Sequence, residues 1–301
     1  MIAHFDDFCL WVHVVVDDMC RELEGHLSRP GPKPACRDRE LIAICLIGEC
    51  LGWDVETELL SHMQAHRHKL PILPEQSRFN RRRRNLMRII NQMRRMMLAR
   101  MALFWDEQCV VDSLPIPVVQ FHLAPQSCGD WRVHGANCGV VSSKKMMIFG
   151  YKLHMLITLR GLILDLELAP ASVGDLAVGR ELLQEHSNRI VIGDKAYVGA
   201  PVAEELWQHN RIRLLTEPRK SQRKQTSASV RRLYKSVRQI IETVTSQLNA
   251  QFSIETNHAH TFWGLFARLY TKLTAHTLCI YINRLLGVHD YLQIKKLAFP
   301  N

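Results

Sequence analysis

Two short apolar runs, each ending in an aspartate, constrain the fold of this chain most strongly. Residues 109–111 precede Asp112, and residues 189–193 precede Asp194. Runs of this length are typical of buried strands, and functional groups in open α/β sheets gather at the carboxyl ends of strands. We therefore expect two neighbouring strands, each followed by a loop, that bring both carboxylates to one edge of a sheet.

The surrounding residues alternate between strand and helix patterns. Residues 149–158 and 162–168 are expected to form a hairpin around Arg160-Gly161, because the second stretch places its leucines on one face. A further strand is expected over residues 212–216, and helices over residues 175–186, 200–209, 228–251 and 262–286. This order favours a ribonuclease-H-like α/β core with a mixed five-stranded sheet and flanking helices, although several α/β folds share parts of it.

An all-α region is expected before this core. Apolar spacing, capping residues and proline breaks predict helices over residues 2–26, 39–51, 54–67 and 77–104. The expected domains are a helical DNA-binding region over residues 1–104, a catalytic domain over residues 105–290 and a C-terminal tail over residues 291–301.

The charge balance favours a polyanionic partner. The chain has 39 Lys and Arg against 29 Asp and Glu, a formal net charge of +10. Nucleic acid is the first expectation and an anionic membrane the second. Asp6 and Asp7 stand where a signal peptide would be cationic, and no apolar run approaches the ~18 residues of a membrane span. We therefore expect a cytoplasmic protein that binds DNA and no membrane.

Two basic stretches are candidate DNA contacts. The helix over residues 77–104 has an apolar face at 3-4 spacing and an arginine-rich remainder. A second basic run spans residues 219–232. A solvated helix face and a plain exposed loop are the respective alternatives. The candidate DNA-binding residues in these stretches are Arg78, Arg81, Arg82, Arg83, Arg84, Arg88, Arg223 and Lys224.

Glu242 is a candidate third acid, from the helix over residues 228–251. Tyr234, Val237, Ile241, Val244 and Leu248 fall on one face of that helix and predict its buried side. Glu242 lies on the adjacent face, one turn after Arg238, which places a carboxylate at the edge of the buried side. Each acid also has an ordinary alternative: a turn or cap residue for the aspartates, and a helix-surface ion pair for the glutamate.

Three carboxylates from separate elements suit a divalent-metal site. Mg²⁺ prefers carboxylate oxygens, and two ions ~4 Å apart clamp the attacking and leaving oxygens of a phosphoryl displacement. We therefore expect Asp112, Asp194 and Glu242 to be the catalytic residues and the ligands of Mg²⁺ or Mn²⁺, with two ions at the site.

Four polar residues near these acids are secondary candidates. Lys152 and His154 share one strand face, where a phosphate contact competes with an ordinary cross-strand pair to Glu167. Asp175 is either a fourth acid or a helix N-cap. Lys195 follows Asp194 directly and is a candidate contact of the scissile phosphate.

The sequence around the acids resembles the insertion sequence 982 family of bacterial DDE transposases. The matching stretches are residues 5–8, Ser77 to Arg82, Val111 to Pro117, Phe149 to His154, Leu168 to Ser172 with Asp175, Gly193 to Tyr197, and Arg238 with Ile241 to Thr243 and Ser246 to Leu248. No single stretch is specific, but their order is. This chain departs from the family pattern at Ala196, Thr245 and Asn249.

The resemblance implies a ribonuclease-H-like core in which Asp112, Asp194 and Glu242 hold the metal and Arg238 is the basic residue before the glutamate. It implies a transposase that cleaves the ends of its insertion sequence and joins them to target DNA, as a homodimer or larger assembly on the terminal inverted repeats, at the bacterial nucleoid. The alternatives are a nuclease with the same core that joins no strands, and a non-catalytic DNA-binding derivative.

Overall fold

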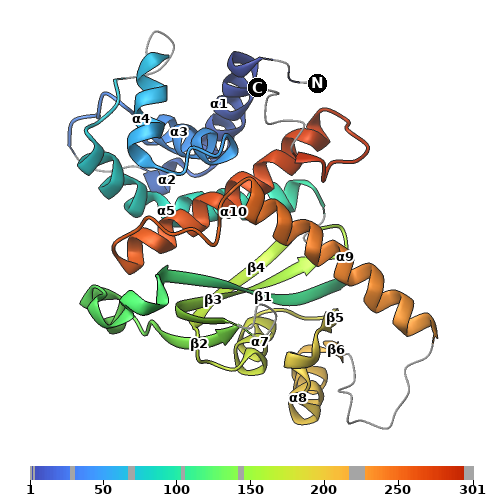
Figure 1. Ribbon diagram of the computed structural model, residues 1–301. Helices are drawn as coiled ribbons and strands as arrows, with labels where there is room; N and C mark the ends of the chain where they lie inside the picture. The colour runs from blue at the N-terminus through green and yellow to red at the C-terminus, as the bar shows by residue number, and fades with distance from the viewer. Residues whose placement is uncertain are drawn as a thin grey trace. The chain divides into compact units, whose positions relative to one another are not determined.

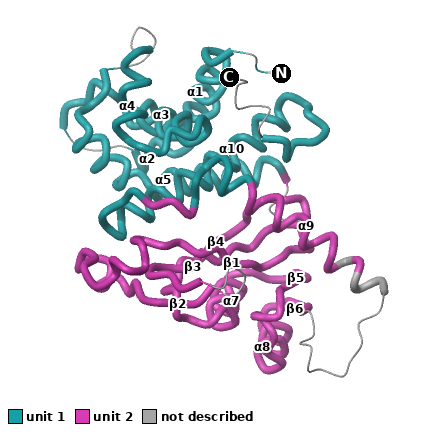
Figure 2. The backbone as a smooth tube through the Cα atoms, in the orientation of Figure 1, with its two compact units in different colours: residues 1–101, 247–254, 258–301 teal, residues 102–246, 255–257 magenta. Residues whose placement is uncertain are grey.

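The computed structural model describes residues 2, 4–27, 31–66, 72–102, 106–141, 146–216 and 228–294. The chain forms two compact units (Figure 2). The first, here the helical unit, contains residues 1–101, 247–254 and 258–301, and the second, the sheet unit, contains residues 102–246 and 255–257.

Among the described residues, six helices lie wholly in the helical unit. Their bounds are α1 Phe5–Glu22, α2 Glu24–Leu27, α3 Asp38–Cys50, α4 Glu56–Ala65, α5 Gln76–Arg100 and α10 Phe262–Leu285 (Figure 1). The four helices predicted in residues 2–104 are confirmed to within a few residues at their ends. α10 lies against α5 and α3. Residues 271–283 of α10 are all buried, as expected of a helix enclosed on every side.

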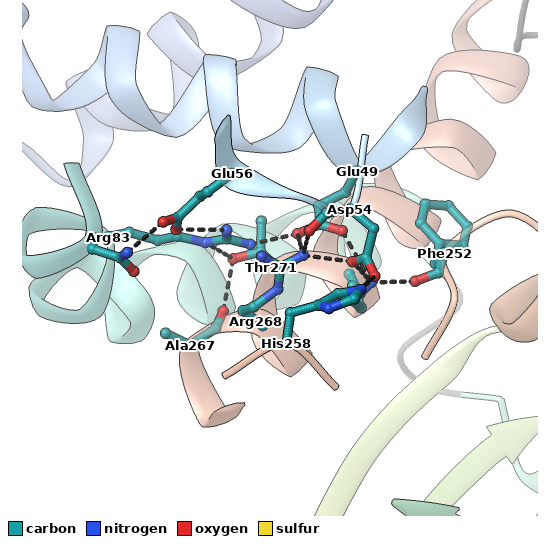
Figure 3. Close-up of polar contacts among 11 residues, drawn as sticks. Glu49, Asp54, Glu56, Arg83, Phe252, His258, Ala267, Arg268 and Thr271 are labelled. Carbon is teal, nitrogen blue, oxygen red and sulfur yellow. Dashed lines mark hydrogen bonds and ion pairs between the residues drawn. The ribbon is translucent and has the colours of Figure 1, made fainter. Parts of the chain in front are cut away.

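A buried network of charged side chains connects α3, α5 and α10 (Figure 3). Glu49 forms an ion pair with Arg83 and lies 3.3 Å from Lys272 Nζ. Lys272 Nζ and Arg268 Nη2 are each 2.5 Å from Asp54 Oδ1. Burial opposes ionisation of Glu49, but Lys272, Arg268 and Arg83 outweigh it and lower the pKa of its carboxyl. The network is therefore a set of paired charges, the state in which buried charges are tolerated.

The compact units divide the chain differently from the expected domains. Residues 105–290 were expected to form one domain, but α10 packs with the N-terminal helices α3 and α5. The first four residues of the expected tail over residues 291–301 are described, and the last of them, Ile294, is fully buried. The expected domain boundaries stay a prediction about functional units.

The sheet unit carries a mixed six-stranded sheet. Its elements are β1 Gln108–Val119, η1 Phe121–Gln126, α6 Gly129–Val133, β2 Asn137–Val141, β3 Met146–Thr158, β4 Ile163–Pro170, α7 Asp175–Gln184, β5 Ile190–Gly193, η2 Lys195–Tyr197, α8 Ala200–Asn210, β6 Arg213–Thr216 and α9 Ala228–Ala250. The order is β2-β3-β1-β5-β6, and β4 also pairs with β3. The first strands are antiparallel, whereas β1, β5 and β6 are parallel. This is the strand arrangement of a ribonuclease-H-like core.

The sequence did not predict β2. This short strand pairs with residues 146–150 of β3, beside the half of β3 that pairs with β4. It contains Asn137 and Gly139, two residue types that are uncommon in strands, so its propensity signal is weak. The predicted sheet therefore had five strands where the structure has six.

β1 does not end at Asp112, which corrects the expectation that a loop follows this residue. The strand continues through Pro115 and Pro117 to Val119. The carbonyl of Glu107 accepts a hydrogen bond from the N–H of Ile190 on β5. Backbone groups alternate in direction along a strand, so every second residue from Glu107, including both prolines, directs its backbone groups toward β5. β5 pairs with β1 only as far as Val111. The prolines therefore lie where no partner needs their missing N–H groups.

Two helices cover one face of the sheet. α7 and α8 pack over a buried apolar cluster that contains Val111, Leu156, Leu182, Val191 and Leu206. α9 passes on the other side of the sheet (Figure 1). The predicted buried face of α9 is confirmed in part, because Val237, Val244 and Leu248 are buried, and Tyr234 and Ile241 are half-buried.

Candidate active site

The strand register places Asp112 and Asp194 side by side. β1 and β5 are parallel and in register as far as Val111 and Gly193, so the two aspartates are the next pair along the strands. Neighbouring strands lie about 4.8 Å apart, and paired residues of parallel strands point to the same face. The predicted neighbourhood of the two strands is therefore confirmed, with both acids at the carboxyl end of β5.

Asp112 lies in an environment that disfavours its charge. Burial raises the pKa of its carboxyl to about 7, and the nearby acids Asp194 and Asp175 add to the effect. The backbone N–H of Ser113 and the charge of Arg238 act in the opposite direction. Two adjacent carboxylates in such an environment suit a bound cation, because its positive charge would stabilise the ionised form of both acids.

A short turn fixes Asp194. Its backbone is extended, and its side-chain Oδ1 accepts a hydrogen bond of 2.8 Å from the N–H of Ala196, so it caps the 3-10 helix η2. Tyr197 donates its backbone N–H to the carbonyl of Asp194 and buries its ring. Asp194 and Lys195 are both exposed. The turn therefore presents one carboxylate to solvent at the end of β5.

Glu242 is exposed on α9, one helical turn after Arg238. Arg238 is close enough to Asp112 to lower the pKa of its carboxyl, so this part of α9 runs near the aspartates. Within the described residues, however, no three His, Cys, Asp or Glu side chains lie close enough to hold one metal ion. The structure thus brings two acids together and leaves Glu242 nearby but outside a common coordination sphere.

Lys152 and His154 pack inside the sheet unit. Lys152 Nζ lies 2.8 Å from Asp175 Oδ1, and His154 is fully buried with its Nδ1 3.1 Å from the hydroxyl of Tyr197. His154 therefore contacts a tyrosine in place of the expected phosphate. Glu167 is its partner in the β3–β4 register, as the hairpin predicted. Burial lowers the pKa of His154 to about 4, so its imidazole is neutral.

Asp175 begins α7, at the position after Gly174. It pairs with Lys152 and also contributes to the raised pKa of Asp112. The expected N-cap role is wrong by one residue, because Gly174 is the N-cap and Asp175 is the first helical residue, where an acid is favourable to the helix dipole. It is a fourth acid of the neighbourhood, neutralised by a lysine.

The family described as "Transposase DDE domain" matches residues 107–278. The chain belongs to this family of DDE transposases. Neither a search of curated proteins nor a search of solved structures found a match. Membership makes this chain a DNA-processing enzyme of the mobile-element class and implies DNA as its partner. Within the described part of the chain, no helix combines the length and apolarity needed to cross a membrane.

The arginine run of this transposase is split between the core and the surface. Successive helical residues are 100° apart, so four neighbouring arginines point in four directions. Arg83 is buried on Glu49, and Arg82 pairs with Asp38 at 2.6 Å. The structure therefore gives these two predicted DNA contacts a structural role. Arg78, Arg81 and Arg88 are exposed, and Arg84 is half-buried.

Four exposed arginines and the half-buried Arg84 form a row along α5, here called the α5 arginine row. Its members are Arg78, Arg81, Arg84, Arg88 and Arg95, at spacings of three, three, four and seven residues. These intervals return to nearly the same helix face. The predicted contacts Arg223 and Lys224 lie outside the described residues.

Sequence reasoning missed Tyr197 as a site residue. Burial, followed by the charges of Asp112, Asp175 and Asp194, raises its pKa well above the ordinary value, so the phenol keeps its proton. The side chain of Ser113 acts in the opposite direction and lowers the pKa, and the hydroxyl lies 3.1 Å from Nδ1 of His154. An aromatic residue three positions after a candidate acid was the available signal.

Proposed function

We propose that this transposase cleaves DNA at the ends of its insertion sequence and joins those ends to target DNA. The observation that supports the proposal most strongly is the position of Asp112 and Asp194, each directly after the last paired residues Val111 and Gly193 of the parallel strands β1 and β5, inside a DDE transposase domain. Three groups of residues divide the work: acids that hold metal, cations near the reacting phosphate, and arginines that hold the flanking DNA.

Asp112, Asp194 and Glu242 are the proposed ligands of Mg²⁺ or Mn²⁺, with two ions at the site. The two aspartates fit a hard divalent cation, because they are adjacent carboxylates and the pKa of Asp112 is raised by burial and by its acidic neighbours. When bound, the ions supply the charge that activates the attacking oxygen and stabilises the leaving one. Glu242 is the proposed third ligand, and its participation requires α9 to shift toward the aspartates.

Two phosphoryl transfers make up the proposed reaction. In the first, water attacks the phosphorus at the element end, the bond to the 3′-oxygen breaks, and a free 3′-hydroxyl and a 5′-phosphate result. In the second, that 3′-hydroxyl attacks a target phosphodiester, and the target's own 3′-oxygen leaves as a hydroxyl. One bond to phosphorus forms and one breaks in each transfer, so no oxidant or external energy source is needed.

Basic side chains near the acids have the proposed task of positioning the phosphate. Arg238 lies near Asp112, and Lys195 is exposed directly after Asp194. Either cation would neutralise a phosphate oxygen that no metal contacts. Lys152 and His154 are excluded from this set, since Lys152 pairs with Asp175 and His154 is fully buried.

The α5 arginine row is the proposed contact for DNA outside the reacting bond. Its five residues extend over about 25 Å of helix at a rise of about 1.5 Å per residue, and within the described residues none of the five forms an ion pair. A row of unpaired arginines suits contacts to successive backbone phosphates, which fix register without specifying sequence. The predicted contacts Arg223 and Lys224 extend this proposal to the second basic run.

We propose the insertion sequence 982 family as the narrower family, on the order of the matching stretches across the chain. We also propose that the transposase acts at the nucleoid of a bacterial cytoplasm. Joining two ends in one reaction requires both to be held together, so we propose a homodimer or a larger assembly on DNA.

A strand-transfer assay tests the proposal. The full chain is mixed with labelled oligonucleotides from the ends of its own element, a supercoiled target plasmid and Mg²⁺. We expect labelled plasmid with the wild type, and none with Asp112→Asn, Asp194→Asn or Glu242→Gln, while each variant still shifts the oligonucleotides in a gel. Oligonucleotides that are cleaved but not joined to the plasmid would show that the chain is a nuclease without strand transfer. Binding without cleavage by the wild type would make the chain a non-catalytic DNA-binding derivative.

A further inference from the structure

Tyr197, in the turn after β5, contacts the strand that pairs with β1. Its hydroxyl lies 3.1 Å from Nδ1 of His154 on β3, and His154 pairs in the β1–β3 register with Ser113, the residue directly after Asp112. The side chain of Ser113 is also close enough to the hydroxyl to lower the pKa of Tyr197. Tyr197 itself ends the turn that Asp194 caps. One phenol therefore contacts the neighbours of both acids.

The hydrogen atoms of this arrangement follow from the surroundings. His154 is neutral, because burial lowers its pKa to about 4. Within the described residues its buried Nε2 has no hydrogen-bond partner, and the nearest carboxylate, that of Asp175, lies 3.9 Å away, so only the negative charge of Asp175 favours the tautomer with the proton on Nε2. Nδ1 of His154 then accepts, so Tyr197 donates its hydroxyl proton to His154.

Two glycines make the space for the Tyr197 ring. A Cβ on Gly179 of α7 would lie 2.7 Å from Cε1 and 2.8 Å from Cδ1 of the ring. A Cβ on Gly193 of β5 would lie 2.9 Å from Cβ of Tyr197. Contacts this short do not occur between real Cβ atoms and their neighbours, so any larger residue would displace the ring. The tyrosine is thus held in a slot as well as by its hydrogen bonds.

We propose that Tyr197 is a positioning residue that fixes the separation of the Asp112 and Asp194 carboxylates for metal binding. His154, Ser113 and the glycine slot act through it. The inference rests on the proposed function, because it assigns these two aspartates to a metal. Outer residues that orient metal ligands typically contribute 10- to 100-fold to metal affinity. A side chain that holds both ligand-bearing elements belongs to this class.

Two variants and one control test the inference. Tyr197→Phe removes the hydrogen bond to His154 and keeps the ring, and Gly179→Ala displaces the ring. Gly129→Ala is the matched control, because a Cβ at Gly129 meets nothing within 4 Å. Binding of Mn²⁺ to the metal-free full chain is measured from the loss of the free-ion signal in electron paramagnetic resonance. The metal dependence of strand transfer is measured alongside, and DNA binding by gel shift.

We expect Tyr197→Phe and Gly179→Ala each to weaken Mn²⁺ binding by about 10-fold or more. DNA affinity should stay unchanged, and high Mn²⁺ concentrations should restore kcat, which loss of fold would not permit. Gly129→Ala should bind Mn²⁺ like the wild type. Wild-type Mn²⁺ affinity in Tyr197→Phe would overturn the inference, and this variant decides the matter if Gly179→Ala does not fold.

Asp194→Asn separates the two proposals. If Asp194→Asn loses Mn²⁺ binding and Tyr197→Phe retains it, the proposed function stands and the positioning role falls. If Asp194→Asn binds Mn²⁺ and transfers strands like the wild type, the proposed metal site itself is wrong, and the role of Tyr197 falls with it.

Discussion

Neutralising Glu49 should destabilise the helical unit more than most single substitutions do. Glu49 is paired with Arg83 and Lys272, and it is 3% exposed. At the 3.3 Å separation from Lys272, the attraction is about 5 kcal/mol for an effective dielectric constant of about 20. Glu49→Gln leaves the buried cations in excess by one charge. Breaking a buried pair by removing one partner typically costs about 3–5 kcal/mol, and we expect a loss in that range.

Hydrogen–deuterium exchange of α3 and α10 peptides measures this loss locally, since a chain with two compact units need not unfold in one step. A loss of about 3 kcal/mol or more corresponds to exchange that is faster by over about 100-fold. The exposed Glu58 on α4 provides the control, and Glu58→Gln should change stability by less than about 0.5 kcal/mol.

A second substitution tests the electrostatic reasoning itself. Lys272→Met added to Glu49→Gln removes one charge of each sign, so the double variant should lose less stability than the sum of the two single losses. Strictly additive losses would refute the reasoning, because they would mean that Glu49 and Lys272 contribute through packing and not through their charges.

Two further predictions follow from the arginines and from a buried histidine. Replacing Arg81, Arg88 and Arg95 together by Gln should lower the log–log salt dependence of DNA binding by about 0.9 per lost phosphate contact, up to ~2.7; an unchanged slope would leave the α5 arginine row merely solvated. Arg83→Gln, by contrast, should destabilise the helical unit. His276 is fully buried, and burial lowers its pKa to about 4. Because the unfolded chain takes up this proton more readily, the free energy of unfolding is unaffected above pH ~6.5. It falls as the pH drops toward 4, by about 3 kcal/mol in total. Denaturation of His276→Gln across this range should therefore be less sensitive to acid than that of the wild type, and equal sensitivity would contradict the assignment.

The periodicity of the sequence was sufficient to predict most elements. The apolar spacing of α5, α9 and α10 and the apolar runs of β1 and β5 each reflect a single local pattern, and the structure places these elements at the predicted residues. β2 was missed because its few residues pair by backbone groups and carry little propensity. The extension of β1 through Pro115 and Pro117 depends on where β5 ends, which no local pattern contains.

The candidate site was predictable in part for the same reason. Asp112 and Asp194 were found from their positions after apolar runs, which is a local signal. The burial of Arg83 and His154 depends on acids and a tyrosine far along the chain. A cationic helix face therefore suggested a DNA contact for Arg83, and strand alternation left a phosphate contact open for His154. Helical angles nevertheless hold the information that Arg83 and Arg81 point in different directions. Tyr197 was missed because its role arises from contacts with Ser113 and His154 on other strands.

The most direct test of the central claim is to map which residues surround the bound metal. Fe²⁺ is placed in the metal-free full chain with element-end DNA, and ascorbate with peroxide then generates hydroxyl radicals that cut the backbone near the ion. The account predicts cuts close to Asp112, Asp194 and Glu242, all suppressed by excess Mg²⁺. Cuts near the two aspartates alone, with residues around Glu242 intact even on DNA, would contradict a site shared by the three acids.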